Sequence, residues 1–201
     1  MNYFIPKEIC RTEESIRRSR FIATAAHADS PETAKHFILE IKKEFPDATH
    51  NCWAFAAGAP GDTARVGMSD DGEPRGTAGR PMLNVLLNSD MGETAVVVTR
   101  YFGGTKLGTG GLVRAYSSAV QKVLEAIPRT EKILRRTVDL ITEYSYHEAI
   151  RRAAERFEGL IRNEIFGADV SMRIEIPEKK MEHFTAFLTD ICKGDIILEK
   201  E

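Results

Sequence analysis

The spacing of apolar residues along the chain switches between the two-residue period of a strand and the three-to-four-residue period of a helix. Phe37, Ile41 and Phe45 follow the helical period, and Ser30 and Pro31 before them are typical of an N-cap and a first helical position. The same patterns predict further helices over residues 77–88 and 112–127, and strands over residues 20–27, 49–57, 64–69 and 94–102. The continuous apolar run in the last of these strands indicates burial on both faces of a sheet.

Beyond residue 132 the pattern becomes more regular. It predicts strands over residues 133–142, 160–166, 170–176 and 195–199, and helices over residues 146–157 and 178–192. This β-α-β-β-α-β order within about 70 residues is typical of a ferredoxin-like domain. Residues 128–131 break the preceding helix with a proline and are the predicted linker. We therefore expect an α+β protein of two domains, over residues 1–130 and 133–201.

Composition narrows the class of protein. Of the 201 residues, 42% are hydrophobic and 29% are charged, which is ordinary for a soluble globular protein. The net charge of −2 argues against a histone-like protein that binds nucleic acid by its overall charge. Residues 1–132 carry 17 basic against 16 acidic side chains, and residues 133–201 carry 11 against 14. We therefore expect any polyanion to meet the first domain.

The cysteines and the N-terminal residues bear on the cell compartment. Cys10, Cys52 and Cys192 are far apart and odd in number, which fits a reducing compartment and gives no sign of a zinc site or a disulfide framework. The chain opens without the apolar segment of a signal peptide, and no apolar run approaches the ~18–20 residues of a membrane span. We expect a cytoplasmic protein with no membrane partner and no cofactor.

A glycine-rich segment is the main candidate for function. Residues 96–116 join a β-branched run to a helical pattern through five glycines in nine residues. The segment is not a Walker A loop, because Gly108 is followed by Thr109 where that motif needs lysine. It is not a dinucleotide-binding fingerprint either, because Val113 stands where the third glycine or an alanine belongs.

Two interpretations of this segment stay open. In the first, the segment is a phosphate cradle, for instance for an RNA backbone, built from the Gly110–Leu112 amides and basic side chains. In the second, it is a tight strand-to-helix crossover that needs glycine for its geometry. The basic side chains favour a ligand. The candidate nucleic-acid or anion-binding residues are Arg100, Tyr101, Phe102, Gly103, Gly104, Lys106, Gly108, Gly110, Gly111 and Arg114. Tyr101 and Phe102 are the candidates for base stacking, whereas the aromatic residues of the strand at 49–57 are expected in the core.

An acidic turn is the second candidate site. Clustered carboxylates such as Asp70, Asp71 and Glu73 bind divalent cations, but their spacing here is not that of an EF-hand. Two alternatives to a cation site stay open. The turn is a solvent-exposed connection, or its acidic side chains form ion pairs with Arg75, Arg80 or Arg100.

His50 and Cys52 are the third candidate. They share one face of a predicted strand, as a nucleophilic pair requires. A thiol in an apolar strand is more often an inert core residue, and no orienting partner can be identified from the sequence. We therefore favour a structural role for Cys52.

Five short motifs stand in the first domain in a distinctive order and spacing. They are Ser19-Arg20-Phe21, Thr49-His50-Asn51-Cys52-Trp53-Ala54, Asp70-Asp71-Gly72-Glu73-Pro74, Gly76-Thr77-Ala78-Gly79, and Arg100-Tyr101-Phe102-Gly103-Gly104 followed by Leu107-Gly108. Together they closely resemble the IMPACT family (UPF0029), in particular its bacterial members of the YigZ/YvyE type. The resemblance covers residues 15–125 by motif, and extends into the second domain mostly at the level of the fold.

The resemblance implies a fold and a function. The first domain would have the two-layer α/β fold shared by the second domain of a small-subunit ribosomal protein and by domain IV of elongation factor G. The second would be ferredoxin-like, similar to the last domain of elongation factor G. Eukaryotic members act in translational control. We expect a translation-associated, non-enzymatic regulatory protein that binds RNA or the ribosome, and no DNA partner.

Two alternatives stay open. One is an enzyme or sensor that binds a small phosphorylated or nucleotide ligand at the glycine-rich segment, with Asp70, Asp71 or Glu73 as a metal or general-base site. The other is a protein partner that docks on the acidic second domain.

Overall fold

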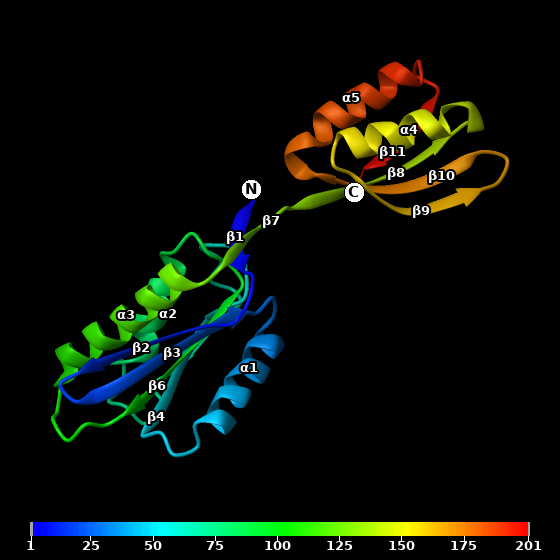
Figure 1. Ribbon diagram of the computed structural model, residues 1–201. Coiled ribbons are helices and arrows are strands. Elements are labelled where there is room, and N and C mark those ends of the chain that lie inside the picture. Colours follow the sequence, from blue (N-terminus) through cyan, green and yellow to red (C-terminus); the bar gives the residue numbers. More distant parts are fainter. Residues whose placement is uncertain (1, 201) are drawn as a thin grey trace. The chain divides into compact units, whose positions relative to one another are not determined.

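The computed structural model of the chain describes residues 2–200 and divides it into two compact units (Figure 1). The N-terminal unit spans Tyr3–Lys132, and the C-terminal unit runs from Ile133 onward. Each unit has its own sheet and its own buried core, which confirms an α+β protein of two domains. No helix among the described residues has the length and apolar content to cross a bilayer.

A five-stranded antiparallel sheet forms the middle of the N-terminal unit. In the order of pairing, its strands are β2 (Cys10–Ile16), β3 (Ser19–His27), β6 (Thr94–Tyr101), β4 (His50–Ala56) and β5 (Val66–Ser69). The central strand β6 is buried over its whole length except at Tyr101. This confirms the burial that its apolar run predicts.

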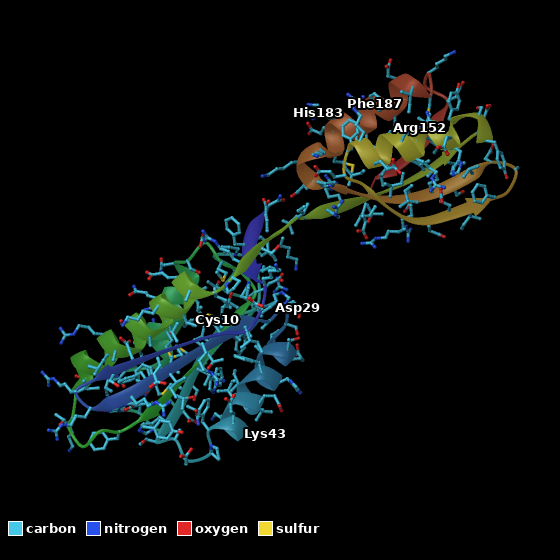
Figure 2. All side chains as sticks on the ribbon, viewed as in Figure 1. Cys10, Asp29, Lys43, Arg152, His183 and Phe187 are labelled. Carbon is cyan, nitrogen blue, oxygen red and sulfur yellow. The ribbon has the colours of Figure 1, made fainter. Side chains whose placement is uncertain are left out.

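Helices cover both faces of this sheet. Val96 and Val98 of β6 face one helical layer, and Ala95 and Val97 face the other. Because β6 is apolar on both faces, one layer of helices could not bury it. The unit therefore has three layers where two were expected, and side chains fill the space on both sides of the sheet (Figure 2). The first layer holds α2 (Gly79–Leu87) and α3 (Thr109–Ala126), and the second holds α1 (Pro31–Glu44).

The predicted linker at residues 128–131 is wrong. Most of it belongs to β7 (Arg129–Lys132), which pairs antiparallel with β1 (Tyr3–Pro6) as a separate two-stranded sheet. The four side chains of β7 are polar, and its partner lies at the opposite end of the unit's sequence, so no local period marks the pair. The first domain accordingly ends at Lys132 instead of residue 130.

The C-terminal unit has the predicted ferredoxin-like order. Its antiparallel sheet pairs as β11-β8-β10-β9, with helices α4 and α5 packed on one face around a core that includes Leu140, Ile174 and Phe184. Figure 2 shows Arg152 of α4 and Phe187 of α5 in this helical layer. The elements are β8 (Arg135–Thr142), α4 (Tyr144–Arg156), β9 (Leu160–Phe166), β10 (Val170–Pro177), the 3-10 turn η1 (Glu178–Lys180), α5 (Met181–Ile191) and β11 (Ile196–Lys200).

Candidate nucleic-acid interface

The loop between β6 and α3 contains the glycine-rich candidate site. Gly108 is the N-cap of α3 and has a φ of 75°, and Gly104 has a φ of 81°, backbone conformations that side chains strongly disfavour. A Cβ on Gly103 would lie 2.0 Å from the carbonyl of Arg18. Glycine at position 103 therefore lets the loop pack directly on the turn between β2 and β3.

The first turn of α3 offers a smaller amide cradle than the sequence predicts. The Leu112 N–H donates to the Gly108 carbonyl at 2.9 Å and so belongs to the helix. Gly110 and Gly111 precede this bond, and no side chain caps the turn. Apart from the neighbouring residues and the backbone of α3 itself, no atom lies within 4 Å of the place that a Cβ on Gly110 would take, so an approaching group can reach the backbone there. Of the three amides predicted to form the cradle, only the N–H groups of Gly110 and Gly111 remain available to a ligand.

Two arginines outside the predicted site lie beside this loop. Arg17 and Arg18 are the two loop residues of the β2–β3 hairpin, in which Ile16 pairs with Ser19. Their φ angles are 47° and 69°, a region in which such hairpins normally carry Asn-Gly because other residues are strained there. The available sequence signal was the run of arginines at 17, 18 and 20.

Four exposed cations border the loop, and we call them the basic end: Arg17, Arg18, Lys106 and Arg114. Arg17 and Arg114 line the same shallow hollow of about 250 Å³, together with Gly111 and Leu107, the neighbour of Lys106. Within the described part of the chain, none of the four forms an ion pair with a carboxylate. The basic end is therefore a local excess of positive charge on an acidic protein.

Arg100 does not belong to this surface. Its side chain is 6% exposed, and its Nη1 donates to Glu73 Oε1 at 2.5 Å while its Nη2 donates to Ser19 Oγ at 3.3 Å. Position 100 follows Val96 and Val98 on the face of β6 that α2 and α3 cover, and a charge buried there needs a partner. The expected phosphate contact at Arg100 is wrong for this structure, and the alternative of an ion pair with the acidic turn is confirmed.

Glu73 connects Arg100 to a second chain of buried hydrogen bonds. The Tyr116 hydroxyl donates to Glu73 Oε1 at 2.9 Å, and the Cys52 thiol donates to the Tyr116 oxygen at 3.3 Å. Burial raises the pKa of Cys52 to about 12 and also raises the pKa of Tyr116. His50 Nε2 lies 3.9 Å from Glu73 Oε2. Cys52 is thus a protonated core thiol, as the structural interpretation predicts, and is not activated as a nucleophile.

Asp70 and Asp71 hold the acidic turn against its surroundings. The Asp70 carboxylate accepts three backbone N–H groups from residues 76–79 at 2.7–3.0 Å and thereby caps the start of α2. Burial alone would raise the pKa of Asp70, but these bonds outweigh it and the pKa is lowered. Asp71 accepts the Asn51 N–H at 2.7 Å and pairs with Lys42 at 2.6 Å.

The predicted acidic site does not assemble around one point. Asp70 caps a helix, Asp71 binds a strand and α1, and Glu73 pairs with Arg100. Among the described residues, no three His, Cys, Asp or Glu side chains are placed to hold a metal ion. Each of the three carboxylates therefore stabilises a different part of the fold.

The two aromatic candidates differ in their surroundings. The Tyr101 hydroxyl donates to Asp47 at 2.9 Å, and the Arg20 guanidinium lies 5.7 Å from the ring centre. Phe102 is 46% exposed, and the guanidinium of the buried Arg100 lies 5.6 Å from its ring centre. Tyr101 thus already has a hydrogen bond and a cation, whereas Phe102 has a partner on one side and is open to solvent on the other.

Fold and site define a two-unit α+β protein whose N-terminal unit carries a basic, glycine-lined end and whose C-terminal unit is ferredoxin-like. Residues 17–124 match the model of the Impact N-terminal domain, and residues 140–195 match that of a domain of unknown function, DUF1949.

Similar proteins cover nearly the whole chain. It is 41% identical to the IMPACT family member YigZ of Escherichia coli (strain K12), over 98% of this chain and 97% of that protein. It is 36% identical to the IMPACT family member YvyE of Bacillus subtilis (strain 168), over 96% of this chain and 88% of that protein. A crystal structure of a hypothetical protein matches with 40% identity and a TM-score of 0.74, covering 100% of this chain and 97% of that one. The chain belongs to the IMPACT family.

Proposed function

We propose that this protein binds RNA, free or within the ribosome, through phosphate contacts at the basic end, and that it acts in the regulation of translation. The observation that carries the proposal is the set of four exposed cations around the glycine loop, none of which pairs with a carboxylate among the described residues. Phosphate contacts supply most of the affinity of nucleic-acid binding without regard to sequence. The proposal extends the family assignment to a ligand class.

Cations elsewhere in the protein support this interpretation by contrast. Arg162 pairs with Glu175 at 2.7 Å, and Lys180 pairs with Glu158 at 3.0 Å. Lys122, about two turns beyond Arg114 on α3, pairs with Glu14. These three cations are thus neutralised by carboxylates, whereas the four cations of the basic end have no carboxylate partner among the described residues.

The backbone at Arg17 and Arg18 gives a second, independent support. Residues held in a disfavoured backbone region each cost roughly 1–3 kcal/mol, and such strain concentrates at sites that bind or react. A two-residue turn needs no arginine for its geometry, since Asn-Gly fits better. Two strained arginines at the tip of a hairpin are accounted for if their charge contacts a ligand.

The experiment compares two charge-matched double variants in RNA binding and in co-sedimentation with ribosomes. K106Q/R114Q removes two cations of the basic end, and R162Q/K180Q removes two paired cations from the C-terminal unit. We expect the unchanged protein to bind labelled RNA at low salt and to pellet with ribosomes, and K106Q/R114Q to bind at least tenfold more weakly. R162Q/K180Q should bind like the unchanged protein. Absence of binding to single-stranded RNA, structured RNA and ribosomes in low salt would refute the proposal.

A further inference from the structure

The exposed ring of Phe102 stands at the edge of the basic end. Its backbone is fixed on both sides: the Phe102 N–H donates to Thr49 Oγ1 at 3.0 Å, and the next N–H, of Gly103, donates to Ser19 Oγ at 3.2 Å. Gly103 also packs against the carbonyl of Arg18. The backbone that carries the ring is therefore held in place next to the strained arginine turn.

The inner side of this ring lies against a buried cation. The Arg100 guanidinium is 5.6 Å from the centre of the Phe102 ring and 5.4 Å from the centre of the Phe21 ring. Its Nη atoms bond to Glu73 and Ser19, and its buried Nε has no hydrogen-bond partner. Both rings lie within cation–π distance of this guanidinium. The Arg100 side chain, which pairs with Glu73, thus contacts the inner side of the Phe102 ring.

The outer side of the ring is available. Phe102 is 46% exposed, although a phenyl group contributes most to stability when it is buried. An exposed ring that is rigidly backed and bordered by cations matches the stacking platforms of single-strand binding proteins, in which a base lies on the ring and the phosphates contact nearby basic side chains. A base paired within a duplex cannot reach such a ring without unstacking.

From this arrangement we infer that the basic end recognises single-stranded RNA, with one unpaired base stacked on Phe102. The inference rests on the proposed function and adds the class of RNA. Tyr101 is not the stacking residue, because its hydroxyl and ring already contact Asp47 and Arg20. Duplex RNA would contact the cations alone and lose the stacking contribution.

The test measures binding of an unstructured, labelled 12-nucleotide RNA and of the same strand annealed to its complement. The variants are F102L, which removes the ring, F102Y, which keeps it, and F4L. Phe4 is a matched control because it is 37% exposed, has the Arg129 guanidinium 4.5 Å from its ring centre, and lies at the opposite end of β6. All three replacements are at the surface, so the fold is preserved.

We expect single-stranded RNA to bind more tightly than the duplex, and F102L to weaken single-strand binding about tenfold with little effect on the duplex. F102Y and F4L should bind like the unchanged protein. Equal affinity for both RNAs, or an F102L variant with undiminished single-strand binding, overturns the inference while K106Q/R114Q still tests the proposed function. Failure of the unchanged protein to bind either RNA refutes the proposed function itself.

Discussion

At the scale of single residues, the buried ion pair of Glu73 and Arg100 constrains the N-terminal unit. Both side chains are almost fully buried, and Tyr116 also donates to Glu73. Removing one partner of such a pair leaves an uncompensated charge in the core, which costs far more than the pair itself contributes.

The Glu73→Gln variant should therefore lower the free energy of unfolding by about 3 kcal/mol, measured by urea denaturation. Glu13→Gln is the matched control, because the Glu13–Arg20 pair is about half exposed and should contribute little. If Glu73→Gln costs no more stability than Glu13→Gln, the buried pair does not have the structural role assigned to it.

Cysteine reactivity gives a second test at this scale. Burial holds the pKa of Cys52 at about 12, so the thiolate needed for alkylation is scarce at pH 8. Cys10 is partly exposed and serves as the internal reference. Iodoacetamide at pH 8 should label Cys10 and spare Cys52 in the folded protein, and label both in urea, as read by peptide mass spectrometry. Equal labelling rates in the folded state would contradict the buried, protonated thiol.

At the scale of elements, the regular part of the fold could be predicted where local periods are strong. The Ser30 hydroxyl accepts the Thr33 N–H at 3.1 Å and caps α1 as expected, and each element of the ferredoxin-like order is present. β2 was missed because its residues are mostly polar: Arg11 pairs with Glu44, and Glu14 with Lys122, where a core strand would have apolar contacts. An edge strand held by such pairs shows no hydrophobic period.

The candidate site could also be predicted only in part from local sequence patterns. The five glycines between residues 103 and 111 could be recognised as a candidate site because their density is a local signal. The burial of Arg100 could not, because it depends on an ion pair with Glu73, 27 positions away in the sequence. Arg17 and Arg18 were missed since hairpin turns are expected to carry glycine or asparagine, and neither occurs there. A local sequence pattern cannot predict an ion pair between residues far apart in the sequence. It also cannot predict a turn whose residues adopt a disfavoured backbone conformation.

The β2–β3 hairpin offers a prediction in which stability and binding change in opposite directions. The double change R17N/R18G introduces the residues that this turn geometry favours and should raise the free energy of unfolding by about 1–2 kcal/mol. The same change removes two cations of the basic end and should weaken RNA binding. Urea denaturation and fluorescence anisotropy measure the two effects. A variant that is more stable and binds RNA undiminished would show that these arginines are not contacts.

The two-stranded sheet of β1 and β7 depends on Glu93. Its Oε1 accepts the Tyr3 hydroxyl at 2.8 Å and pairs with Lys132, and its Oε2 lies 2.8 Å from His27 Nε2. Burial alone would raise the pKa of Glu93, but the bonds from Lys132, His27 and Tyr3 outweigh it and the pKa is lowered. Burial and the bond to Glu93 raise the pKa of Tyr3 to about 12.

These shifts predict a pH dependence of stability. Because the folded pKa of Glu93 is lowered, its contribution is present above the ordinary carboxyl pKa and is lost as the pH falls through the folded value. Because the folded pKa of Tyr3 is raised, its contribution is present below pH ~10 and is lost as the pH approaches 12. Melting temperatures of the unchanged protein and Glu93→Gln from pH 3 to 8 should converge at the acid end. Parallel curves would contradict the role of the Glu93 carboxylate.

At the scale of the whole molecule, the proposed RNA contact is one local basic surface on a protein whose net charge is negative. The net charge is −2, yet the N-terminal unit keeps four cations unpaired around one loop within the described residues. Relatives at 41% and 36% identity extend over both units, so the ferredoxin-like unit is part of the shared architecture. We expect the RNA contact to lie in the N-terminal unit alone.

The dependence of RNA affinity on salt tests this account most directly. Each phosphate contact to a single strand contributes about −0.7 to the slope of log K against log salt, so four contacts predict a slope of about −2.8 and a loss of about fiftyfold between 50 and 200 mM salt. R17N/R18G should reduce the slope to about −1.4. A slope near zero, or one unchanged by this double variant, would contradict the assignment of the basic end as the RNA-binding surface.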